Sequence, residues 1–300
     1  MKRGLSLLAL AMTLCIAASG WAQDSNTSRF KGFNAYETFQ GTASSSSTLL
    51  KLDSSVGYDF NEHFGLFAGV PLYFANDRTA RGNAAPLTSD GGGAGDFYFG
   101  MDLYAPNPYL DYSSSVTVSA PTGSVSKGFS TGRRTVDWTN RLRRHFGKFA
   151  PYVALGLSNT VPDTDLLTRA FTSLGNIGHF EEGADYDLTR RVYLGASAYQ
   201  IVPFGNQQVF NRVNPADSGP GPGGGDNQNP PAAQPPPAQP SASGADLTRE
   251  NGFDTWLGFE PSRLVRLEAG YSRSITFALN RVSFNVGLNL GRMLRGRKTH

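Results

Sequence analysis

The stretch RVSFNVGLNL, residues 281–290, decides the fold class of this chain. Every second residue from Val282 to Leu290 is apolar, and the residues between them are charged, polar or glycine. A period of two is the pattern of a β-strand with one apolar face. The stretch HFGLFAGVPLYF, residues 63–74, repeats it with an apolar row from Phe64 to Phe74. Each row has roughly the 9–11 residues of a β-strand that crosses a membrane at a tilt.

The same pattern, followed along the chain, predicts twelve strands. They are expected near residues 30–41, 48–60, 63–75, 95–104, 109–120, 132–146, 148–159, 172–186, 191–204, 250–260, 263–274 and 279–294. Glu37 interrupts the apolar row of the first, and 172–186 alternates least clearly. An even number of antiparallel strands suits a closed barrel. We therefore predict an all-β fold, an up-and-down transmembrane antiparallel β-barrel of about 12 strands.

The connections alternate between short and long. Short ones follow every second strand, as at Asn61-Glu62, whereas most of the others are long, including 76–94, 121–131, 160–171 and 205–249. A barrel with both termini in the periplasm has short turns there and long loops outside. Aromatic residues flank the short turns, as an interfacial girdle requires: Phe60 and Phe64, Tyr104 and Tyr109, Phe146 and Phe149, Tyr186 and Tyr193. A soluble β-sandwich would not explain the alternation of loop lengths.

Residues 1–22 have the pattern of a secretory signal peptide. A basic start is followed by an apolar run and by a small residue, Ala22, suited to cleavage. The only cysteine, Cys15, lies in this segment, so no disulfide is expected in the mature chain. We expect residues 23–300 to form one domain in the bacterial outer membrane, with cleavage near Ala22.

Composition excludes several classes of protein. Charged residues make up 17% of the chain, and no later stretch is apolar for the ~20 residues of a membrane helix. This argues against a helical membrane protein and against a charged helical bundle. The net charge of +3 includes Lys2 and Arg3 of the signal segment, so nucleic acid is not an expected partner.

Residues 214–246 differ in kind from the rest. They hold nine of the 18 prolines and almost no apolar bulk. Such a segment cannot bury a core. We expect a disordered extracellular loop, with a proline-rich binding motif as the less favoured reading.

The sequence offers little that resembles a catalytic or metal site. None of the four histidines is spaced for a metal with another ligand, and no nucleophile elbow or phosphate-binding loop is present. The run GGGAGD at residues 91–96 occurs once and reads as a flexible loop. We expect no metal, no cofactor and no enzymatic activity.

Charged residues fall on the polar faces of the predicted strands. A charge facing lipid at mid-depth costs about 2–4 kcal/mol, so these side chains are expected to line the lumen. The candidates are Lys51, Asp53, Asp96, Asp102, Arg133, Asp137, Arg141, Arg266, Glu268 and Arg281. They either brace the barrel by neutralising one another or line a permeation path.

Residues 63–160 resemble the outer-membrane transporter family named for the meta-pathway of phenol degradation. The resembling pieces, in order, are GVPLYF at 69–74, GDFYFG at 95–100, VTVSAPTG at 116–123, a Ser-Thr-Gly before the sixth strand and RHFG at 144–147. The resemblance implies an outer-membrane β-barrel that passes small, often aromatic or hydrophobic compounds. It implies no catalytic or binding residues. The proline-rich loop and the basic C-terminus, with His300 in place of a terminal aromatic residue, depart from the family pattern.

The expected function is passive passage or uptake of small molecules. The expected partners are outer-membrane lipid and lipopolysaccharide, the barrel-assembly machinery and a small-molecule solute. Two alternatives stay open at this point: a structural or adhesive surface barrel with a blocked lumen, and a secreted soluble β-protein.

Overall fold

The computed structural model describes residues 31–45, 47–77, 92–107, 109–164, 166–212, 241–243, 248–262 and 264–290. Its strands are β1 (Gly32–Ser44), β2 (Ser47–Asp59), β3 (Phe64–Asp77), β4 (Gly92–Ala94), β5 (Phe97–Ala105), β6 (Asp111–Ala120), β7 (Thr135–Arg143), β8 (Phe149–Ser158), β9 (Phe171–Leu174), β10 (Ile177–Asp187), β11 (Val192–Pro203), β12 (Gln207–Asn211), β13 (Ser241–Ser243), β14 (Glu250–Ser262), β15 (Val265–Ser274) and β16 (Leu279–Asn289).

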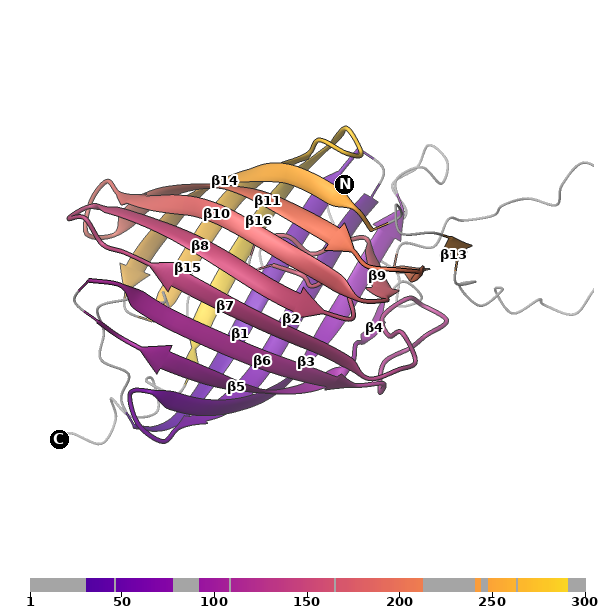
Figure 1. Cartoon of the computed structure of the whole chain (residues 1–300), viewed down its shortest axis with the longest axis horizontal. Coiled ribbons are helices and arrows are strands. Elements are labelled where there is room, and N and C mark those ends of the chain that lie inside the picture. The colour runs from indigo at the N-terminus through magenta and orange to yellow at the C-terminus, as the bar shows by residue number, and fades with distance from the viewer. Residues whose placement is uncertain are drawn as a thin grey trace, which may run out of the picture.

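Thirteen of these strands form one closed antiparallel barrel (Figure 1). Their order is β2-β1-β16-β15-β14-β11-β10-β8-β7-β6-β5-β3-β4, and β2 also pairs with β3, which closes the ring. The first and last strands are joined along β1 and β16, from Tyr36 opposite Asn289 to Ser44 opposite Arg281. Closure leaves no long unpaired strand edge, which is what a β-structure in lipid needs.

The predicted barrel of twelve strands is confirmed. The short β4 and the longer β5 pair with different parts of β3, so together they occupy one of twelve positions around the barrel. The run at residues 91–96 was expected to be a loop. Instead, Gly92–Ala94 pair with Leu72–Phe74, and only Gly95 and Asp96 interrupt the ladder.

The predicted strand at 172–186 is wrong in one respect, because it is two strands. Gly175 has a φ of 151° and separates β9 from β10. A side chain there would meet Asn206 O and the Gln207 side chain at 2.6 Å. Only glycine fits so close an approach in this backbone region. β10 continues the barrel, whereas β9 joins a small second sheet in the order β13-β12-β9.

The two ends of the barrel differ. The connections from β2 to β3, β5 to β6, β7 to β8, β10 to β11 and β14 to β15 are short and lie at one end, whereas the small second sheet and the described connection 121–134 lie at the other (Figure 1). The alternation of loop lengths is therefore built into the barrel. Of the predicted proline-rich loop, Ser241–Ser243 form β13; residues 214–240 and 244–246 lie outside the described residues, as do the signal segment and the basic C-terminus.

No helix in the described part of the chain is long and apolar enough to cross a membrane.

Candidate functional site

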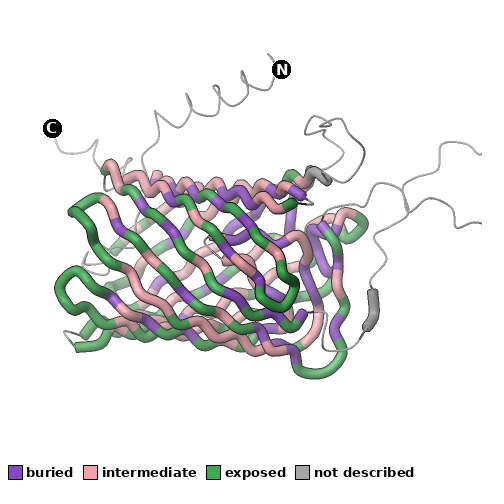
Figure 2. The backbone as a smooth tube through the Cα atoms, turned by 90° about the horizontal axis from the view of Figure 1, so that it is seen from above, coloured by how far each residue is buried: buried purple, intermediate pink, exposed green. Residues whose placement is uncertain are grey.

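The outer face of the barrel is apolar along its strands. Exposed and buried residues alternate along strands such as β8, β14 and β16, as the colours along the tube in Figure 2 illustrate for the barrel wall. Large apolar side chains that face outward and are more than half exposed include Val282 at 61%, Leu155 at 54% and Leu157 at 55%. A soluble monomer rarely exposes contiguous apolar patches beyond a few hundred Å². This face is therefore the membrane-facing surface of the barrel.

The girdle at the short turns is present in part. The rings of Phe60 and Phe64 stack with centroids 5.4 Å apart, and Phe146 and Phe149 are exposed beside their turn. Tyr193 was expected in this girdle, but it is buried inside the barrel. Its position in β11 pairs with Gly258 of β14 on the interior face, and its ring fills the space above that glycine.

The lumen is lined by charged pairs, some within one strand and others reaching across an intervening strand. Lys51 Nζ lies 3.2 Å from Asp53 Oδ2, Arg143 Nη2 lies 2.9 Å from Asp185 Oδ2, and Arg266 Nη2 lies 2.6 Å from Glu268 Oε1. A further pair joins Arg281 to Glu250 at 2.8 Å, and His179 Nε2 lies 3.3 Å from Asp137 Oδ2. Tyrosine hydroxyls extend the network, since Tyr152 donates to Glu181 and Tyr98 to Asp53. Both signs of charge are thus present around the wall.

Eight of the ten predicted lumen residues occupy interior positions on barrel strands. They are Lys51, Asp53, Asp102, Asp137, Arg141, Arg266, Glu268 and Arg281. Arg133 does not line the lumen: it is exposed and precedes β7, which begins at Thr135, because residues 131–134 belong to the connection. Asp96 is half-buried between β4 and β5, where its carboxylate accepts a hydrogen bond from Gly123 N at 2.9 Å.

A connection expected outside the barrel folds into it. We call residues 159–170, of which 165 is not described, the inner loop. Thr168 N donates to Thr42 Oγ1 at 3.0 Å, and Gln40 Nε2 donates to Thr164 O at 3.2 Å. Thr42 and Gln40 lie on the interior face of β1, so these bonds fix the loop to the inside of the wall. Leu167 and Thr168 are each only 1% exposed.

Asp163 is the first ionic anchor of the inner loop. Its two carboxylate oxygens accept hydrogen bonds from Arg212 Nη1 at 2.9 Å, and Oδ2 also accepts one from Tyr73 OH of β3 at 3.1 Å. Burial alone would raise the pKa of Asp163, but the nearby charges of Arg212 and Lys51 outweigh it and hold the pKa below its usual range. The carboxylate is therefore ionised at neutral pH and ties the loop to the segment that follows β12.

Arg169 is the second ionic anchor of the inner loop, and its backbone N also donates to Asp163 Oδ1 at 2.9 Å. Its guanidinium donates to Glu250 Oε2, while Arg281 holds the other carboxylate oxygen. Between the anchors, Leu166 packs on a trio of interior aromatic residues, Tyr152, Tyr193 and Trp256. The inner loop thus has two buried ion pairs and an apolar contact inside the lumen.

The inner loop covers one side of the lumen and leaves the other side open. β16 is hydrogen-bonded to β1, and its interior residues from Arg281 to Asn289 are all buried. Apart from the buried Thr135, the interior residues of β6 and β7 are partly exposed: Ser113, Ser115, Thr117 and Ser119 on β6, and Asp137, Thr139, Arg141 and Arg143 on β7. Hydroxyl groups dominate this wall. We call it the β6–β7 wall.

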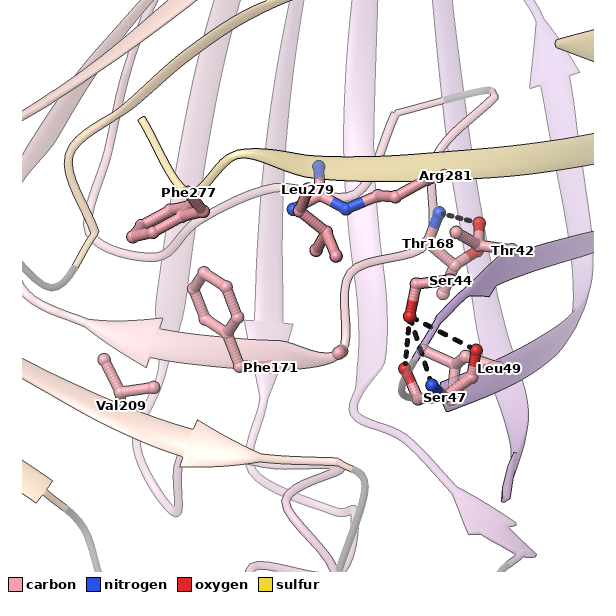
Figure 3. Close-up of a pocket in the computed structure, with 11 residues that line it drawn as sticks. Thr42, Ser44, Ser47, Leu49, Thr168, Phe171, Val209, Phe277, Leu279 and Arg281 are labelled. Carbon is pink, nitrogen blue, oxygen red and sulfur yellow. Dashed lines mark hydrogen bonds between the residues drawn. The ribbon is translucent and has the colours of Figure 1, made fainter. Parts of the chain in front are cut away.

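A pocket of about 290 Å³ lies at the long-loop end (Figure 3). Six of its eleven lining residues are apolar: Leu49, Ala170, Phe171, Val209, Phe277 and Leu279. The hydroxyls of Thr42, Ser44 and Ser47 and the guanidinium of Arg281 complete it, and the Ser44–Ser47 and Thr168–Thr42 hydrogen bonds run along one side. We call it the rim pocket. Its volume and mainly apolar lining suit a small organic molecule.

Sequence reasoning missed the inner loop and with it Asp163, Arg169, Glu250 and the aromatic trio. The sequence carries one signal: the connection holds Val161, Leu166 and Leu167 beside charged residues, which is unlike a solvated loop. Among the described residues, no group of three or more His, Cys, Asp or Glu side chains is arranged to hold a metal ion.

Comparison with known proteins gives a fold. No family model matches the chain, and no curated protein sequence matches it. Among solved structures, an outer membrane channel from Pseudomonas putida F1 has a TM-score of 0.56 at 13% identity, over 90% of this chain and 99% of that one. This chain shares the fold of an outer-membrane channel. The KdgM porin (8% identity, 84% and 98% covered, TM-score 0.47) and the NanC porin (8%, 84% and 97%, 0.44) are weaker likenesses.

At 13% identity the likeness concerns the architecture alone. It agrees with the apolar outer face and the closed ring described above. The resemblance of residues 63–160 to the phenol meta-pathway family stays a prediction, as does the solute.

Proposed function

We propose that the chain is an outer-membrane channel for small molecules, constricted by its inner loop and open along the β6–β7 wall. The observation that carries the proposal is the half-exposed hydroxyl and charged wall inside a closed barrel with an apolar outer face. Polar groups spaced along a wall allow a solute to bind weakly at many positions, as conduction requires. Export by the signal segment, cleavage near Ala22 and outer-membrane residence belong to the same proposal.

The rim pocket supports a solute with an apolar or aromatic body. An apolar cavity of about 150 Å³ binds a benzene-sized molecule, and the rim pocket is larger. Arg281, its charged lining residue, is already paired with Glu250, so the pocket presents little free charge. This supports uptake of small, mostly apolar compounds from the long-loop side.

A second candidate is a surface barrel with a blocked lumen. The inner loop favours it, because two buried ion pairs and the Leu166 contact hold this segment inside the barrel. The two candidates differ on whether the β6–β7 wall is reached by solutes.

Chemical modification of single-cysteine variants in planar bilayers decides between the channel and the blocked barrel. The only natural cysteine lies in the signal segment, so an introduced one is unique in the mature protein. A charged methanethiosulfonate reagent should reduce the conductance of Thr117→Cys, on the β6–β7 wall. Ser283→Cys is the matched control, because Ser283 faces inward but is only 4% exposed. Modification of neither residue, with no conductance, would favour the blocked barrel.

A further inference from the structure

Arg141 differs from the other cations of the lumen. Among the described interior residues, Lys51, Arg143, Arg169, Arg212, Arg266 and Arg281 each have a carboxylate within 4.0 Å. Arg141 has none: its guanidinium instead lies over the ring of Tyr152, 4.6 Å from the centroid. A guanidinium stacked on a ring keeps its N–H donors free at the edge of the plane.

The surroundings of Arg141 leave those donors accessible. Its register neighbours are Ser113 on β6 and Ala154 on β8, both too short to cover it. Glu181 lies beyond Ala154, two strands away from Arg141 in register. Glu181 also accepts a hydrogen bond from Tyr152 OH at 2.5 Å. Arg141 is half-exposed on the β6–β7 wall, which the inner loop leaves open.

The other charged side chains near Arg141 already have partners. Arg143 is paired with Asp185, and the Asp137 carboxylate is engaged by Thr139 Oγ1 and lies 3.3 Å from His179 Nε2. Tyr152 is fixed on one side by Leu166 of the inner loop. The ring under Arg141 is therefore held in place at the edge of the constriction.

We propose that Arg141, Tyr152 and Ser113 form a binding site for the carboxylate of a small solute with a flat or apolar body. The guanidinium supplies paired N–H donors that match a carboxylate, Ser113 supplies a hydroxyl donor, and Tyr152 supplies an aromatic face. The site deepens the proposed function, because it names the polar group of the solute that the channel passes.

The test uses benzoate as the probe and benzyl alcohol as its neutral counterpart. In planar bilayers, benzoate should reduce the potassium chloride current of the wild type at lower concentration than benzyl alcohol. Arg141→Gln should weaken the benzoate effect about tenfold, the loss expected for one charge-assisted contact. Arg143→Gln is the matched control: it removes the same charge two residues along the strand but should change the benzoate effect less than threefold.

If Arg141→Gln and Arg143→Gln weaken the benzoate effect equally, the proposal is overturned, because the effect would then depend only on the net charge of the lumen. A wild type that does not distinguish benzoate from benzyl alcohol would also overturn it. Saturation-transfer NMR of benzoate on the purified protein separates this inference from the channel proposal. An Arg141-dependent signal without conductance would support the site and refute the channel; conductance without that signal would do the reverse.

Discussion

At the scale of single residues, the orientation of β7 decides which of its side chains point into the lumen and which point towards lipid. Trp138 is 44% exposed on the outer face, where its Nε1 donates to Ser114 Oγ at 3.0 Å. Asp137, one residue away, points inward and accepts a hydrogen bond from Thr139 Oγ1 at 3.2 Å. Adjacent residues of one strand therefore meet lipid and lumen respectively.

Replacing Trp138 by Asp should impair assembly, because a charge on the lipid face costs about 2 kcal/mol. Asp137→Ala should assemble normally and shift the reversal potential towards anion selectivity, since it leaves the lumen more positive. Heat-modifiable migration on SDS gels measures assembly, and bilayers under a salt gradient measure selectivity. If Trp138→Asp assembles and Asp137→Ala does not, the facing of β7 is reversed.

Residue-level prediction from sequence succeeded where period two is uninterrupted. The alternation in residues 63–74 and 281–290 gave the correct inward and outward faces of β3 and β16. The alternation placed Arg133 wrongly. Polar and apolar residues alternate already before β7 begins, but hydrogen bonding between β6 and β7 starts only at Thr135. The alternation also left unresolved Glu37, an outward residue whose carboxylate is satisfied by Ser54 Oγ at 2.8 Å. A cross-strand partner is not visible in the sequence of one strand.

At the scale of elements, the inner loop is the part that sequence could not place. A loop folded into a barrel is defined by partners far along the chain: Thr168 binds Thr42, and Arg169 binds Glu250. These contacts depend on barrel closure, which no local pattern encodes. The strands themselves were predictable because each carries its own apolar face.

Asp163→Asn should loosen the inner loop and raise conductance at neutral pH. Removing one partner of a buried ion pair costs roughly 3 kcal/mol or more. In Asp163→Asn this loss destabilises the position of the inner loop inside the barrel. The pKa of Asp163 lies below its usual value of 3.8, so its contribution is complete above that pH and is lost as the pH falls through the lower value. Wild-type conductance should therefore rise only in strong acid. A wild type that opens near pH 6 would exclude Asp163 as the anchor that titrates.

The proline-rich segment should contribute little to the barrel. Replacing residues 214–246 with a short Gly/Ser link removes β13, which pairs with β12 over only three residues. Loop-closure entropy changes slowly with length, so assembly should be retained. Resistance of the folded barrel to SDS in the cold measures this. Loss of that resistance would show that β13 supports the small second sheet.

At the scale of the whole molecule, the two ends should face different compartments. With the short turns in the periplasm, the connections 76–94 and 205–249 are extracellular. An epitope inserted near Gly224 should bind antibody on intact cells, whereas one inserted at Gly147, in a short turn, should not. Labelling of the Gly224 epitope only after rupture of the outer membrane would reverse the orientation.

The central claim is a lumen narrowed but not sealed by the inner loop, and single-channel conductance tests it most directly. The measurement compares the wild type with a variant in which residues 161–169 are replaced by a short glycine link, both in planar bilayers at the same salt concentration. We predict small, resolvable steps for the wild type and steps at least about threefold larger for the variant, because removing the constriction widens the pore. Silence of the wild type beside a conducting variant, or equal steps in both, would contradict the account.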